Sequence, residues 1–197
     1  MQYELLTGLV AFAFVSSITP GPNNMMLLAS GANFGFARTV PHMLGISLGH
    51  AFMVFLVGIG LAQIFIAYPI IKQVMLGIAV VYMLWLAWKI ANAAPATASE
   101  TSGNPLTFFQ AAAFQWVNPK AWGMALTAVT AYAPGETLLA MALVAIVFAS
   151  VNLPSVSTWT ILGQQLQRFL RDRARLRAFN WAMATMLVGS LYFVVQL

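Results

Sequence analysis

Apolar residues fill most of the chain in six long runs, which are separated by shorter polar segments. A run of about 18 or more apolar residues is long enough to cross a bilayer as a helix. The pattern therefore predicts an all-α integral membrane protein with six transmembrane helices. The predicted spans are residues 5–31, 40–66, 70–91, 106–131, 138–162 and 178–197.

The composition supports a chain that lies mainly in lipid. Of the 197 residues, 61% are hydrophobic and only 7% are charged, whereas soluble domains contain about 25% charged residues. No lysine or arginine precedes Arg38, so the first run lacks the basic start of a secretory signal peptide. We interpret it as a first span that is retained.

Cysteine is absent, which excludes disulfides and thiolate metal sites. With two histidines and four acidic residues that fall in loops or at span ends, no metal or cofactor is expected. An intramembrane enzyme would need an activated nucleophile, but Ser16 and Ser17 have no histidine–carboxylate partner within a span. The chain is therefore predicted not to be an enzyme.

Basic residues predict the orientation. Five of the nine lie between Arg168 and Arg177. A net charge of +5 would suggest nucleic acid in a soluble protein, but here it indicates topology beside lipid headgroups, and no nucleic-acid partner is expected. The positive-inside rule places this loop, with Arg38 and Lys89, in the cytoplasm of a bacterial cell. Both termini would then be periplasmic to the inner membrane.

The first span is interrupted by the segment Thr19-Pro20-Gly21-Pro22-Asn23-Asn24. About 27 residues of helix would measure roughly 40 Å, against a hydrocarbon core of about 30 Å. The prolines and the glycine predict a break, which lipid tolerates only against protein or a water-filled cavity. Asn23 and Asn24 could bind the ammonium and carboxylate groups of a solute there, or could cap the second half-helix.

A matching break is predicted in the fourth span, at Asn118-Pro119-Lys120. The polar linker 93–105 divides one transmembrane domain, residues 1–197, into repeats of about 1–92 and 106–197. Because each repeat has three spans, the two must run in opposite directions. Inverted repeats with broken helices 1 and 4 are typical of secondary transporters that bind their solute near the midplane.

Lys120 is the most costly residue to place in a membrane. A lysine at a helix centre costs about 2.5–3.5 kcal/mol on insertion scales. Its stem could extend to an interface, or its amine could face an internal cavity and pair with a solute carboxylate. No acidic residue lies within a span to neutralise it, which favours the second interpretation.

Other polar and small residues within the spans have two interpretations each. His50 could couple transport to protons or could be a hydrogen-bonded packing residue. Gly45 and Gly49 form a small-xxx-small face that is typical of close helix packing. Asn152, near a weaker third break at Pro154, could line the cavity or bond a neighbouring helix. The second histidine, His42, follows Pro41 and is predicted to be interfacial.

These motifs together resemble the LysE/RhtB amino-acid exporters. The resemblance covers nearly the whole chain. It is carried by Thr19-Pro20-Gly21-Pro22-Asn23, the Gly45-xxx-Gly49 face, Tyr82-Met83-Leu84-Trp85-Leu86-Ala87-Trp88-Lys89, and Asn118-Pro119-Lys120. The stretches Leu-Gly-Ile-Ser-Leu-Gly and Trp-Leu-Ala-Trp-Lys-Ile-Ala look most like the cysteine/O-acetylserine exporter group.

The resemblance implies export of amino acids or their derivatives, driven by the proton gradient. It also implies a transport path formed by Pro20, Gly21, Pro22, Asn23, Asn118, Pro119 and Lys120. The expected partners are an amino-acid substrate, the lipid bilayer and, as in many small six-span proteins, a second copy of the chain. A passive channel and an exporter of another small solute stay open as alternatives.

Overall fold

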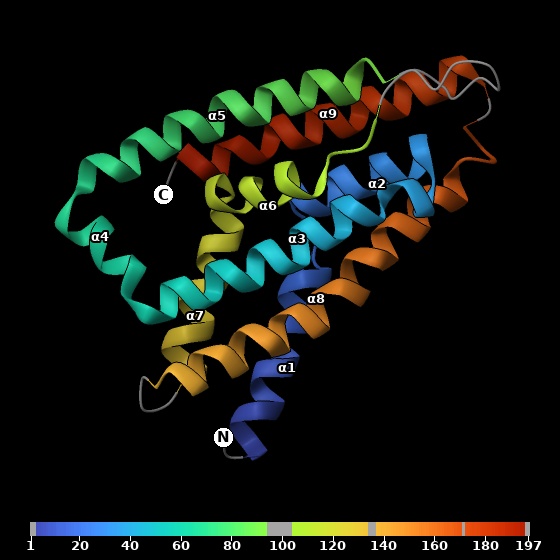
Figure 1. The fold of residues 1–197 in the computed structure, drawn as a ribbon. Coiled ribbons are helices and arrows are strands. Elements are labelled where there is room, and N and C mark those ends of the chain that lie inside the picture. Colours follow the sequence, from blue (N-terminus) through green and yellow to red (C-terminus); the bar gives the residue numbers. More distant parts are fainter. Residues whose placement is uncertain (1–2, 94–103, 134–136, 171, 196–197) are drawn as a thin grey trace.

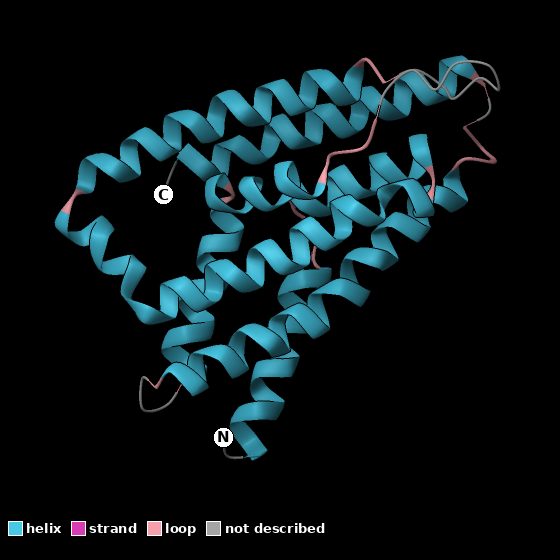
Figure 2. Cartoon of the chain, viewed as in Figure 1, coloured by secondary structure: helices cyan, strands magenta, loops and turns pink. Residues whose placement is uncertain are grey.

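The computed structural model describes residues 3–93, 104–133, 137–170 and 172–195, and every regular element in these ranges is a helix (Figure 2). Most of the predicted linker, 94–103, lies outside the described residues. The helices are α1 (Tyr3–Ile18), α2 (Pro22–Phe34), α3 (Phe36–Leu56), the π-helical turn η1 (Val57–Leu61), α4 (Ala62–Ala67), α5 (Pro69–Ala91), α6 (Phe108–Val117), α7 (Pro119–Tyr132), α8 (Leu138–Leu166) and α9 (Arg173–Val195).

The helices α3 and α8 pack against each other and form the middle of the molecule. Both α1 and α2 pack on α8, whereas α6 and α7 pack on α3. At one edge, α5 and α9 lie side by side (Figure 1). The breaks between α1 and α2 and between α6 and α7 are thereby held on the two central helices.

Three helical segments are long and apolar enough to cross a membrane: Phe36–Ile64, Gln73–Ala91 and Leu138–Leu166. The pair α1 and α2, bent by 57°, qualifies together as a fourth. Large apolar side chains such as Phe109 and Leu139 are 80% and 70% exposed on the surface, as lipid-facing residues would be. The chain is therefore a multi-pass membrane protein. By length and apolar composition, three or four spans are found in the described residues.

Local sequence explains where the half-helices begin. Thr107 caps α6 by accepting a hydrogen bond from the Gln110 amide at 3.3 Å, and the Gln110 side chain accepts one from the Thr107 amide at 3.0 Å. Pro22 and Pro119 occupy the first turns of α2 and α7, where a missing amide proton costs nothing. The proline motifs thus start new helices as well as ending the preceding ones.

One expectation about breaks is wrong, and one kink was not expected. The weaker third break does not exist, because α8 continues through Pro154. Beside this proline, Ser155 Oγ donates to the Val151 carbonyl at 2.8 Å. An unexpected kink occurs instead at Gly60, whose φ of 108° is accessible mainly to glycine, between α3 and α4.

Candidate functional site

The unwound segment between α1 and α2 is bound by a side chain from the other half of the chain. The Lys120 amine, at the start of α7, donates hydrogen bonds to the Thr19 carbonyl at 2.7 Å, the Thr19 hydroxyl at 2.9 Å and the Pro20 carbonyl at 3.2 Å. The backbone at Gly21 is extended, which leaves these carbonyls without helical partners. The two breaks therefore lie directly against each other.

This contact decides between the two interpretations of Lys120. The amine bonds the carbonyls of the first break, so the side chain does not extend to a membrane interface. An unpaired carbonyl in lipid costs several kcal/mol, and bonds from a charged donor are about twice as strong as neutral ones. The backbone oxygens of one half thus compensate the charge contributed by the other half.

A second contact between the halves joins Asn23 to Gln115. Asn23 Nδ2 donates to Gln115 Oε1 at 2.9 Å, and Gln115 Nε2 donates to Asn23 Oδ1 at 3.2 Å. Gln115 also donates to the Ala111 carbonyl and is fully buried. We did not assign Gln115 to the site from the sequence, although an amide within an apolar run was a usable signal.

The carbonyls that end α1 are satisfied by side chains from elsewhere. Asn24 Nδ2 donates to the Ser17 carbonyl at 2.8 Å and the Thr19 carbonyl at 2.7 Å. Trp159 Nε1, from α8, donates to the Ile18 carbonyl at 3.0 Å. No side chain caps α2, so the capping interpretation of the asparagines is wrong: Asn24 terminates the preceding helix instead.

Replacing Asn24 with leucine is expected to destabilise the protein by about 1–3 kcal/mol. The change removes the bond to the Ser17 carbonyl in a buried place, and an unsatisfied group costs about 1–3 kcal/mol, whereas the Thr19 carbonyl still accepts from Lys120. The free energy of unfolding in mixed micelles, followed by tryptophan fluorescence, measures the effect. Asn92→Leu is the control, since its amide also donates to a helix carbonyl but is exposed, and it should change stability by less than about 0.5 kcal/mol.

The second break is built around Asn118. Its backbone is extended, and its Oδ1 accepts a hydrogen bond from the Lys120 amide at 3.2 Å. Asn118 is buried, and Pro119 follows it as the first residue of α7. This geometry directs the Lys120 side chain toward Gly21, where an added Cβ would lie 2.9 Å from Lys120 Cδ.

Both breaks line a cavity of about 20 Å³. Its walls include Asn23, Asn24, Asn118 and Lys120, and His50 reaches it from α3. A volume of this size holds about one or two water molecules. The structure therefore shows a closed state of the site, too small for an organic solute.

His50 is buried, and its ring lies edge-on to Phe148 with centroids 5.3 Å apart. Neither ring nitrogen bonds any residue that the structure describes. The interpretation of His50 as a hydrogen-bonded packing residue is therefore wrong. His50 is among the residues that line the cavity beside the two breaks.

Asn152 lies outside the cavity wall and links three helices. Ser47 Oγ, on α3, donates to Asn152 Oδ1 at 2.9 Å, and Asn152 Nδ2 donates to Ser17 Oγ, on α1, at 3.1 Å. Ser17 itself lines the cavity. Asn152 is thus connected to the cavity by its hydrogen bond to Ser17.

The two predicted packing glycines lie against α6. A Cβ added at Gly49 would be 2.6 Å from Ala112 Cα, and one added at Gly45 would overlap the Phe108 carbonyl oxygen. The absence of side chains lets α3 approach α6 closely. This approach holds the second break near the first.

Comparison with known proteins agrees with this architecture. Residues 14–196 match the family described as LysE type translocator. The chain is 30% identical to the cysteine/O-acetylserine efflux proteins of Escherichia coli (strain K12), Shigella sonnei (strain Ss046) and Salmonella typhi, over 194 residues that cover 95% of this chain and 96% of each relative. No solved structure matches it significantly.

The family match covers nearly the whole chain and includes both breaks and all of the cavity walls. The resemblance drawn from the proline motifs is confirmed. A translocator also agrees with helices that are apolar enough to cross a membrane. The chain is therefore a membrane transporter rather than an enzyme, and it belongs to the LysE family of translocators.

Proposed function

We propose that the protein exports small neutral amino acids or their derivatives from the cytoplasm across the bacterial inner membrane. The family match and the relatives named as cysteine/O-acetylserine efflux proteins support this activity. The observation that carries it is the Lys120 amine on the unwound segment between α1 and α2. The site joins a cation to the backbone oxygens of the first break beside a small cavity.

A zwitterion matches the chemistry of this site. The Lys120 ammonium and the first amides of α2, at the positive end of the helix dipole, attract a carboxylate. The Thr19 and Pro20 carbonyls, which now accept from Lys120, are acceptors for an ammonium group. A solute with both charges could thus replace the contacts that Lys120 makes in the closed state.

The proposed architecture has six spans in two inverted repeats, residues 1–92 and 106–197. The pairing of helices supports it, because α3 packs on its counterpart α8 and α5 packs on its counterpart α9. The contact of α1 with α8 is likewise matched by that of α6 with α3. With the Arg168–Arg177 loop in the cytoplasm, both termini lie in the periplasm.

Transport by purified protein in liposomes tests the proposal. With an imposed pH gradient, we expect [³⁵S]L-cysteine to accumulate above its external concentration, and a protonophore to abolish the accumulation. Because the chain has no cysteine, the label cannot be retained as a mixed disulfide. Equilibration without accumulation would favour the passive channel, and no movement of any amino acid would contradict the proposal.

His50 is proposed to carry the coupled proton. Its imidazole lies at the cavity without a hydrogen-bond partner among the described residues, and imidazole titrates near physiological pH. In the same liposomes, His50→Gln should still exchange labelled for unlabelled cysteine but lose accumulation driven by the pH gradient. Retained accumulation would exclude His50 from coupling.

A further inference from the structure

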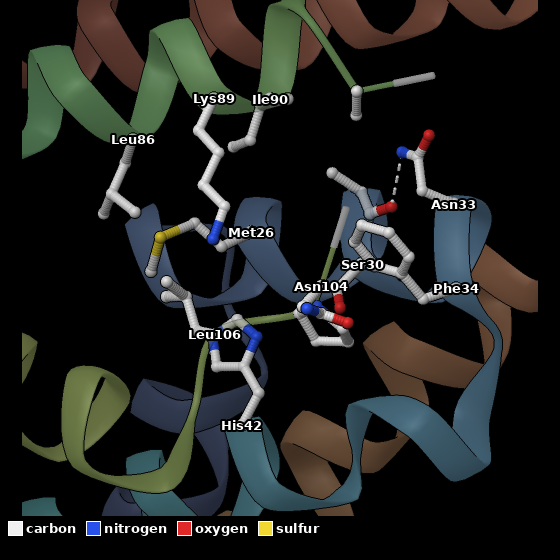
Figure 3. Close-up of a pocket in the computed structure, with 13 residues that line it drawn as sticks. Met26, Ser30, Asn33, Phe34, His42, Leu86, Lys89, Ile90, Asn104 and Leu106 are labelled. Atoms are coloured by element: carbon white, nitrogen blue, oxygen red, sulfur yellow. Dashed lines mark hydrogen bonds between the residues drawn. The ribbon is translucent and has the colours of Figure 1, made fainter. Parts of the chain in front are cut away.

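A second, larger cavity of about 50 Å³ lies between α2, α3 and α5 (Figure 3). It shares no lining residue with the cavity at the two breaks. Most of its walls are apolar and include Met26, Leu86 and Leu106. Two of its side chains are basic, Lys89 from α5 and His42 from α3, and they point into the same space from opposite walls (Figure 3).

His42 has no role in the site described above. The sequence led us to expect an interfacial residue, but His42 is only 1% exposed, so this expectation is wrong. Neither ring nitrogen bonds any residue in the described part of the chain. A buried imidazole without partners loses the hydrogen bonds it would make to water, so a ligand that bonded His42 would restore them.

Lys89 supplies a charge at the same cavity. Its amine lies 5.5 Å from the centre of the Trp85 ring, and it forms no ion pair or hydrogen bond with the described residues. Among the described residues, no aspartate or glutamate lines the cavity. A cation between apolar walls, where electrostatic interactions are stronger than in water, attracts an anion.

The size of the cavity restricts the ligand. A volume of about 50 Å³ holds roughly four water molecules, which is about the size of a carboxylate with one attached carbon. Lys89 and the protonated nitrogen of a neutral His42 can both donate to a carboxylate, while the other His42 nitrogen can accept from an ammonium group. An α-amino acid carries both groups on one carbon.

We propose that this cavity is a second binding site for the substrate carboxylate, on the side where the positive-inside rule places the cytoplasm. This inference rests on the proposed export of amino acids. Lys89 and Arg38 are among the basic residues of the cytoplasmic side, and Arg38 Nη2 donates to Asn104, a residue that lines the cavity, at 3.1 Å. A cytoplasmic amino acid would bind here before it reaches the breaks.

The two histidines of the chain provide the test, because each lines one cavity. Protein labelled with [¹⁵N]histidine in zwitterionic lipid nanodiscs is titrated with L-cysteine under reducing conditions, and the ring-nitrogen resonances are followed. His42→Gln and His50→Gln variants assign them. Cysteamine, which has the same thiol and ammonium groups but no carboxylate, is the ligand control.

We expect saturable shifts of His42 with L-cysteine and none with cysteamine. Lys89→Met should raise the apparent dissociation constant read from His42 about tenfold or more, because one charged contact is lost. Lys89→Arg should largely retain the affinity of the wild-type protein. Lys120→Met should leave the His42 titration unchanged. Size-exclusion chromatography confirms that each variant is folded.

The outcomes separate the two proposals. Shifts of His50 alone would overturn the second site and leave the proposed function intact. Shifts of His42 alone would support the second site and contradict substrate binding at the breaks, and the absence of both would overturn both. A further variant replaces Glu100, in the linker outside the described residues, with glutamine. If His42 shifts only in Glu100→Gln, the cavity binds the carboxylate of Glu100 rather than a substrate, and the inference is overturned.

Discussion

Replacing Lys120 with methionine is expected to reduce export about 100-fold or more without preventing membrane insertion. Methionine keeps an apolar stem but cannot donate to the Thr19 and Pro20 oxygens. A hydrogen bond from a charged group contributes about 1.5–3 kcal/mol, and the change removes three of them together with the carboxylate-binding charge. The initial rate of [³⁵S]L-cysteine transport in liposomes, normalised to folded protein, measures the loss.

Insertion of this variant should be unimpaired for a physical reason. Removing a half-buried ammonium group from a span eliminates an insertion cost of up to about 2.5–3.5 kcal/mol, which offsets part of the lost bonding. Arg173→Met removes a positive charge from an exposed residue at the start of α9, and it is expected to transport at the wild-type rate. Export by Lys120→Met at a rate close to that of Arg173→Met would remove Lys120 from the mechanism.

Replacing Gly163 with alanine is expected to destabilise the protein by about 3 kcal/mol or more. A Cβ at this position of α8 would overlap the Leu28 carbonyl oxygen of α2 and would lie 2.9 Å from the Ala32 nitrogen. Both are backbone atoms that cannot rotate away, so the two helices must separate. Their contact positions the first break, and transport should fall with stability.

Gly77→Ala is the matched control. Nothing lies within 4 Å of a Cβ added there, in the middle of α5. Because alanine favours helix over glycine by roughly 1 kcal/mol, this variant should be slightly more stable than the wild-type protein. Denaturant titration in micelles compares Gly163→Ala with Gly77→Ala. Equal stabilities of these two variants would show that the contact between α2 and α8 is looser than the structure describes.

The sequence predicted those elements whose cause is local. Long apolar runs correctly indicated helices and membrane insertion, because burial of apolar surface in lipid depends on composition alone. The breaks at Pro22 and Pro119 were likewise placed, since a proline cannot continue a helix from the preceding turn. Pro154 failed as a signal for a break: α8 continues through it.

Contacts between distant segments could not be read from the chain. Nothing in the local sequence pairs Asn23 with Gln115, or sends Trp159 to the end of α1. His42 was misplaced for the same reason: proximity to a span end suggests an interface, but packing against α2 and α5 buries it. The burial of a polar group depends on which distant segments pack around it, and a single sequence does not identify those segments.

The bonds between the two breaks also bear on how tightly transport is controlled. An empty carrier can widen the small cavity only by losing the Lys120 and Asn23–Gln115 hydrogen bonds with nothing to replace them. A bound zwitterion would offer its carboxylate to Lys120 and its ammonium group to the backbone carbonyls of the first break. Leakage through the unloaded protein should therefore be slow, and under the proposed function a cell would keep its ion gradients while no substrate is bound.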